Sequence, residues 1–158
     1  MHVWRQPSPH GELTVVVTDA GLYEISLPGD DQPDVEMTTV DRGVARQLDD
    51  WFAGTRTAFD LALDLHEVEG FRLDVLQTLA REVPWGEIVT YGELAAMAGR
   101  PRAARAVGSA MRNNPLPFVI PCHRVVAAGN KIGGYGGGRN AISLKRELLA
   151  CEGVSTLR

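Results

Sequence analysis

Residues 121–125 read Pro-Cys-His-Arg-Val and place a thiol, an imidazole and a guanidinium next to one another in the chain. Proline fixes its own backbone angle φ, so this turn is expected to present Cys122 in a defined position. A thiolate is a strong nucleophile, but a free thiol with a pKa of about 8.5 is mostly protonated at neutral pH. We therefore predict that Cys122 is a nucleophile with an activating base nearby, rather than an inert buried cysteine.

The segment around this motif is basic, although the whole chain has a net charge of −4. No Asp or Glu occurs from Leu94 through Arg146, and all 20 acidic residues lie outside this segment. Its cations are Arg100, Arg102, Arg105, Arg112, Arg124, Lys131, Arg139, Lys145 and Arg146. Such asymmetry is typical of a polyanion-binding half attached to an acidic half. A solvated basic face without a partner is the alternative, and the nucleophile inside the segment disfavours it.

The composition limits the classes of protein to be considered. With 158 residues, of which 44% are hydrophobic and 23% charged, the chain suits one globular domain or two small ones. No stretch approaches the roughly 20 apolar residues of a membrane span, and residues 1–6 lack the apolar region of a signal peptide. Two cysteines are too few for a disulfide framework. We expect a cytoplasmic protein without membrane contact and, from the absence of ligand spacing, without a metal.

The elements that must position the motif fall into two groups. In the first group, residues 12–18 and 22–27 alternate as strands around a turn at 19–21, which predicts a hairpin. Residues 41–53 have helical spacing and end at Gly54, and residues 61–65 alternate like a further strand. This part predicts a small sheet with one helix.

The second group is mainly helical. Apolar residues from Phe71 to Leu79 fall at helical spacing, and this helix stops before Pro84. Thr90 and Glu93 have the spacing of a capping box for a helix over 91–98. A helix over 102–111 follows a short break at 99–101, so the pair predicts a helix-turn-helix whose second helix enters a DNA groove. Cys151 lies in an apolar helical stretch, and we expect it in or near the core.

Several further motifs accompany the cysteine segment. They are Val-Pro-Trp-Gly at 83–86, Thr-Tyr-Gly-Glu-Leu-Ala at 90–95, Ala-Ala-Arg-Ala-Val-Gly at 103–108, Asn-Pro at 114–115, Gly-Tyr-Gly-Gly-Gly at 134–138 and Glu-Gly at 152–153. Together with 121–125 they resemble the O6-alkylguanine-DNA alkyltransferases, which are suicidal methylated-DNA–protein-cysteine methyltransferases. The match is dense from about Phe71 to Gly153 and loose before it.

The resemblance implies an α+β fold with two domains. Residues 1–69 would form a ribonuclease H-like supporting domain with a small antiparallel sheet and a helix. Residues 70–158 would form a mainly helical winged-helix, or helix-turn-helix, domain that binds DNA and accepts the alkyl group.

The activity that the resemblance implies is direct-reversal DNA repair. An alkyl group would pass irreversibly from O6-alkylguanine, and less readily from O4-alkylthymine, to Cys122, once per protein molecule. The partner would be double-stranded DNA that carries the lesion, with the damaged base flipped out because its target atom cannot be attacked inside the duplex. The family pattern also implies a monomer that needs no cofactor and no obligatory protein partner.

The resemblance assigns a role to each catalytic residue. His123 would accept the thiol proton through a water, and Glu152 would hold the required imidazole tautomer. Neighbouring residues of an extended chain point to opposite faces, so a relay between Cys122 and His123 is physically sensible. Tyr91 would donate a proton or a strong hydrogen bond to the departing guanine. Asn114 would tie the helix-turn-helix to the active-site loop.

DNA contacts and a substrate pocket are implied in the same way. Arg105 would fill the space that the flipped nucleotide leaves, and small residues beside it would permit close approach to the minor groove. The implied DNA-binding residues are Tyr91, Ala103, Ala104, Arg105, Gly108, Arg112 and Arg124. The implied pocket residues are Pro117, Val125, Tyr135, Gly136 and Gly137.

Two functions of other classes stay open from the sequence alone. Alkyltransferase-like proteins share the scaffold and bind lesions without transfer, but they commonly replace the nucleophile by Trp, whereas Cys122 is present here. A cysteine hydrolase or a redox thiol protein would act repeatedly on small substrates. That alternative would leave the basic segment unexplained.

Overall fold

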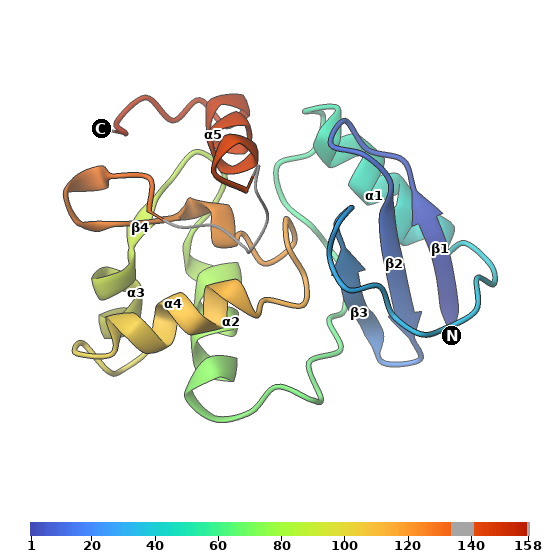
Figure 1. Ribbon diagram of the computed structural model, residues 1–158, viewed down its shortest axis with the longest axis horizontal. Coiled ribbons are helices and arrows are strands. Elements are labelled where there is room, and N and C mark those ends of the chain that lie inside the picture. Colours follow the sequence, from blue (N-terminus) through green and yellow to red (C-terminus); the bar gives the residue numbers. More distant parts are fainter. Residues whose placement is uncertain (134–140, 158) are drawn as a thin grey trace. The chain divides into compact units, whose positions relative to one another are not determined.

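The computed structural model describes residues 1–133 and 141–157. The chain divides into two compact units, Met1–Leu65 and His66–Arg158. The fold is of the mixed α+β class: the first unit holds a three-stranded antiparallel sheet and the second holds most of the helices (Figure 1). No helix within the described ranges is both long and apolar enough to cross a membrane.

The sheet of the first unit has the strand order β1-β2-β3. Strands β2 (Leu13–Thr18) and β3 (Gly21–Ser26) form the expected hairpin. Strand β1 (His2–Gln6) was not expected, and it pairs antiparallel with β2 along its whole length. Helix α1 (Arg42–Phe52) confirms the expected helix; the Asp41 side chain caps it by accepting a hydrogen bond from the Val44 N–H.

Residues 61–65 do not form the full strand that their alternation predicts. A single bridge joins Leu22 to Leu63, made by the Leu22 N–H to the Ala62 carbonyl at 2.9 Å and the Asp64 N–H to the Leu22 carbonyl at 2.8 Å. Gly21 has φ +140°, and a Cβ there would clash with the Ala62 carbonyl. The segment therefore approaches the sheet edge only because position 21 is a glycine.

The second unit is built on three helices that pack together: α2 (Gly70–Glu82), α3 (Tyr91–Met97) and α4 (Ala104–Arg112). The predicted capping box of α3 is confirmed, because the Glu93 N–H donates to Thr90 Oγ1 and the Thr90 N–H donates to Glu93 Oε1. Helix α5 (Ala141–Cys151) follows near the end of this unit.

A short parallel pairing connects the helices to the cysteine segment. Strand β4 (Val89–Thr90) pairs with β5 (Val125–Val126), with Val89 opposite Val125 and Thr90 opposite Val126. Two 3₁₀ turns flank β5, namely η1 (Cys122–Arg124) and η2 (Ala128–Asn130). The pairing brings the start of α3, where Tyr91 lies, beside the segment that follows Cys122.

Candidate active site

Cys122 is the first residue of η1 and is only 5% exposed. Its N–H donates to the Ile120 carbonyl at 2.7 Å, and the Arg124 N–H closes the turn on the Pro121 carbonyl at 2.9 Å. The segment is thus a 3₁₀ turn and not the extended chain on which the argument for a relay rested. A tight hydrogen-bonded turn fixes the Cys122 backbone more firmly than an extended loop would.

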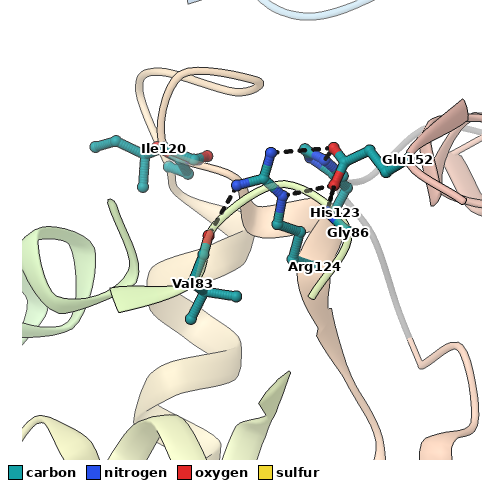
Figure 2. Close-up of polar contacts among 7 residues, drawn as sticks. Val83, Gly86, Ile120, His123, Arg124 and Glu152 are labelled. Carbon is teal, nitrogen blue, oxygen red and sulfur yellow. Dashed lines mark hydrogen bonds and ion pairs between the residues drawn. The ribbon is translucent and has the colours of Figure 1, made fainter. Parts of the chain in front are cut away.

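His123 is fully buried and lies 2.6 Å from Glu152, measured from Nε2 to Oε2 (Figure 2). Burial lowers the pKa of His123 below its usual value, although the hydrogen bond to Glu152 opposes the shift. The imidazole is therefore neutral at neutral pH, with one protonated nitrogen. Because an ionised carboxylate only accepts hydrogen bonds, Nε2 carries the proton and Nδ1 carries the lone pair that can accept one.

Glu152 is ionised despite being buried. Burial by itself would raise its pKa, but hydrogen bonds from His123 and Arg124 outweigh that effect and lower the pKa to about 2. The Gly86 N–H adds a longer hydrogen bond to Oε1, at 3.3 Å. A carboxylate held in this way stays charged and fixes the orientation of the His123 ring.

The structure corrects the expectation that Arg124 contacts DNA. Arg124 is 5% exposed, and its Nε and Nη2 donate to the two oxygens of Glu152 at 2.7 and 3.1 Å. Its Nη1 donates to the Val83 carbonyl at 2.8 Å (Figure 2). This two-pronged buried ion pair leaves the guanidinium no surface to offer to a phosphate, so Arg124 belongs to the support of Glu152.

Asn114 holds the loop that leads to the cysteine. Its Nδ2 donates to the Ile120 carbonyl at 2.8 Å, and its Oδ1 accepts the Leu116 N–H at 3.0 Å. Within this loop the buried Phe118 has a φ of +73°, which is a strained conformation for a bulky residue. Asn114 thus joins the end of α4 to the turn that carries Cys122.

Tyr91 is the first residue of α3 and is half-buried. Gly133, with a φ of +69°, lies so close that a Cβ there would be 3.1 Å from the Tyr91 ring and 3.2 Å from its hydroxyl oxygen. A glycine backbone therefore lines this side of the ring. Pro117 and Val125 are buried, while Tyr135, Gly136 and Gly137 fall outside the described residues.

The face of α4 that is turned away from the core carries the implied DNA contacts. Arg105 and Arg112 are exposed, whereas Val107, Ala110 and Met111 are buried. Ala103, Ala104 and Gly108 are half-buried, and a Cβ on Gly108 would meet no atom within 4 Å. Gly108 lies between the two exposed arginines, and Ala103 and Ala104 come just before Arg105, so the small residues leave the helix surface thin enough for a backbone to approach closely.

Sequence reasoning overlooked Lys145 and misplaced Cys151. Lys145 is fully buried on α5, on the same face as Leu148, Leu149 and Glu152. The spacing i, i+3, i+4 and i+7 of these four residues was the available signal. Cys151 is exposed, which contradicts the expected place in the core: it lies two residues beyond Leu149 and so about 200° round the helix.

The buried imidazole predicts a pH dependence of stability. Since folding lowers the pKa of His123, the unfolded chain binds more protons below about pH 6.5, and the free energy of unfolding should fall as the pH decreases there. The slope from one such group is at most about 1.4 kcal/mol per pH unit. Urea unfolding between pH 7 and pH 5 should show a steeper decline for the wild type than for His123→Asn. Equal slopes would contradict a neutral buried His123.

Within residues 1–133 and 141–157, no group of three or more His, Cys, Asp or Glu side chains is placed to hold a metal ion.

Comparison with known proteins places this site in a family. Residues 70–154 match the family model described as 6-O-methylguanine DNA methyltransferase, DNA binding domain. The range contains Cys122, His123 and Glu152. It covers more than half of the chain.

Curated relatives carry the name methylated-DNA–protein-cysteine methyltransferase. The protein from Homo sapiens is 37% identical over 92% of this chain and 77% of its own length. The protein from Mycolicibacterium paratuberculosis is 47% identical over 70% of this chain and 64% of its own length. A third relative of that name, from Cricetulus griseus, is matched over only 41% of its length, at 53% identity over 56% of this chain.

Among solved structures, one described as Mycobacterium tuberculosis OGT in complex with DNA is similar with a TM-score of 0.86. It is 38% identical, and the match covers 96% of this chain and 92% of that one. The similarity therefore extends through both units and is not limited to the region around the cysteine.

Proposed function

Because the chain belongs to the 6-O-methylguanine DNA methyltransferase family, we propose that it repairs DNA by moving an alkyl group from O6-alkylguanine to Cys122. The observation that carries the proposal is the buried Cys122 next to a neutral His123 that is hydrogen-bonded to an ionised Glu152. This is the nucleophile, base and orienting group that a thiol needs to react at neutral pH.

The reaction balances as a displacement at carbon. Nδ1 of His123 takes the thiol proton, through a water, and the Cys122 sulfur attacks the alkyl carbon. The new S–C bond forms while the bond from that carbon to the guanine oxygen breaks, and its electron pair stays on the guanine. A hydrogen bond or proton from the Tyr91 hydroxyl relieves the charge on the departing base. The products are guanine and a thioether at Cys122. The thioether does not release its alkyl group, so the protein cannot react a second time.

The proposal extends to the way in which the protein binds DNA. We assign α3 and α4 as a helix-turn-helix within a winged-helix domain, with α4 entering the minor groove and Arg105 filling the place of the flipped base. The mutual packing of α2, α3 and α4 and the exposed arginines of α4 support this assignment. The first unit would be a ribonuclease H-like supporting domain. We further propose that the protein acts in the cytoplasm as a monomer and without a cofactor.

The test of the function is its stoichiometry. Duplex DNA that carries O6-methylguanine should lose its methyl groups in proportion to the protein added, with a limit of one group per molecule. Continued demethylation by a substoichiometric amount of protein would contradict the proposal, because a thioether at Cys122 ends the activity.

Replacing Arg105 separates DNA binding from thiol chemistry. Arg105→Ala should slow transfer from duplex DNA about tenfold to a hundredfold, because the flipped state loses a side chain that offsets part of the unstacking cost. The rate of alkylation by free O6-benzylguanine, which needs no flipping, should stay within about twofold of wild type. Arg81→Ala, which removes an exposed arginine from α2, is the matched control. An equal loss on both substrates would contradict the assigned role.

A further inference from the structure

The first turn of α2 carries an exposed arginine that contacts the C-terminal end of α4. Arg72 is the third residue of α2, and its Nη2 donates to the Asn113 carbonyl at 2.6 Å. Asn113 is the C-cap residue of α4, and the carbonyls at a helix end lack partners within the helix. A guanidinium suits this position because it supplies both an N–H donor and a positive charge at the negative end of the helix dipole.

The side chain before Arg72 contacts the turn at the other end of α4. The Arg100 guanidinium lies over the Phe71 ring, 5.0 Å from its centre. Arg100 is in the turn before α4, and its carbonyl accepts the N–H of Ala103, the N-cap residue of α4, at 3.0 Å. Two consecutive residues of α2 therefore hold α4 at both ends, and α4 is the helix whose exposed face carries Arg105.

The end of α4 is also linked by hydrogen bonds to the nucleophile. The residue after Asn113 is Asn114, whose side chain donates to the Ile120 carbonyl at 2.8 Å. The same carbonyl accepts the Cys122 N–H at 2.7 Å. One peptide unit and three hydrogen bonds thus connect Arg72 with the backbone of Cys122. A displacement of the α4 end would be passed along this path to the turn that carries the thiol.

We propose that Arg72 is a positioning residue for the transfer, which fixes the end of α4 and through it the turn that carries Cys122. The inference rests on the proposed function, since it concerns the geometry of the same reaction. Displacement at carbon needs the sulfur in line with the breaking bond, and a misplacement of about 1 Å caused by a distant change can slow a reaction by about 10²-fold. Losing one exposed hydrogen bond should have a smaller effect, a slowing of about three- to tenfold.

The alternative role for an exposed arginine in this unit is a direct contact to a DNA phosphate. Removing such a contact would weaken DNA binding, reduce its salt dependence and leave the rate of the bound complex unchanged. It would also have no effect on a substrate without phosphates. A positioning role has the opposite signature, because duplex DNA and a free base both react at the Cys122 turn.

The experiment measures affinity and rate separately in Arg72→Met. At saturating duplex DNA with O6-methylguanine, the single-turnover rate should fall about three- to tenfold, and alkylation of Cys122 by free O6-benzylguanine should slow by a similar factor. The affinity for unmodified duplex should stay within about twofold of wild type. Arg72→Lys should recover most of the rate, because a single charged donor reaches the carbonyl. Arg81→Met, which removes an exposed arginine from the last turn of α2, is the matched control and should react as wild type.

Two further measurements separate positioning from a general loss of stability. Arg72→Met/Asn114→Ala should react no more slowly than Asn114→Ala alone, because both changes interrupt the same path. Hydrogen exchange of the Ile120 and Cys122 amides should accelerate about three- to tenfold in Arg72→Met, while the amides of α3 exchange at the wild-type rate.

An unchanged rate at saturation in Arg72→Met, or unchanged exchange of the Ile120 and Cys122 amides, would overturn the proposal. Additive losses of rate in the double variant would overturn it as well, and weaker DNA binding as the only effect would assign Arg72 to a phosphate instead. A wild-type protein that transfers no alkyl group from DNA would count against the proposed function alone, since the amide exchange still shows whether Arg72 positions the turn.

Discussion

Arg124→Met should lower the free energy of unfolding by about 3–5 kcal/mol, because it removes one partner of a buried ion pair and leaves the other charge without compensation. Arg124 makes three hydrogen bonds inside the protein, two of them to Glu152. Methionine preserves much of the side-chain volume, so the loss reports on charge and hydrogen bonding more than on packing. Urea unfolding at pH 7 measures the effect.

An exposed arginine–glutamate pair in the same unit provides the matched control. Arg81 and Glu82 are 2.8 Å apart with side chains 67% and 48% exposed, so Arg81→Met should cost no more than about 1 kcal/mol. The double variant Arg124→Met/Glu152→Gln should lose less than the sum of the two single variants, since no unpaired charge stays buried. Similar losses of unfolding free energy for Arg124→Met and Arg81→Met would show that the buried ion pair stabilises the protein no more than the exposed pair does.

Glu152→Gln should slow the single-turnover transfer of a methyl group by about 10²–10⁴-fold. The amide keeps the shape of the carboxylate but carries no charge, so it no longer fixes the protonated Nε2 of His123 or stabilises the imidazolium that forms when Nδ1 takes the thiol proton. The rate is measured with protein in excess over duplex DNA containing O6-methylguanine, at pH 7.5.

The affinity of Glu152→Gln for the same DNA should stay within about twofold of wild type, because Glu152 is buried and α4 is unchanged. Glu69→Gln removes an exposed carboxylate that caps no helix through its side chain, and it should transfer at the wild-type rate. A rate within about threefold of wild type for Glu152→Gln would rule out the His123–Glu152 pair as the activating base.

Local signals in the sequence predicted much of the second unit. The spacing of Thr90 and Glu93 depends only on residues close together in the chain and is typical of a helix N-terminus. The capping box that it predicts is present. The family resemblance, carried by the motifs from 83 to 153, is confirmed by the family match over residues 70–154. The roles of the individual site residues stay predictions.

The failures share a physical cause, which is that burial depends on contacts far apart in the chain. Arg124 was read as part of a basic run, but it pairs with a carboxylate 28 positions further along. Lys145 was counted among the same cations although it is buried. Strand β1 was overlooked because its partner is supplied by β2, and residues 61–65 have the alternation of a strand but only one bridge to the sheet edge.

The most direct test of the central claim is intact-protein mass spectrometry after mixing the protein with duplex DNA that carries O6-methylguanine. The account predicts a gain of one methyl group per molecule, mapped by peptide analysis to Cys122, and no gain in Cys122→Ala although that variant still binds the DNA. An unmodified wild-type protein that nevertheless binds the lesion, or a methyl group mapped to the exposed Cys151, would contradict it.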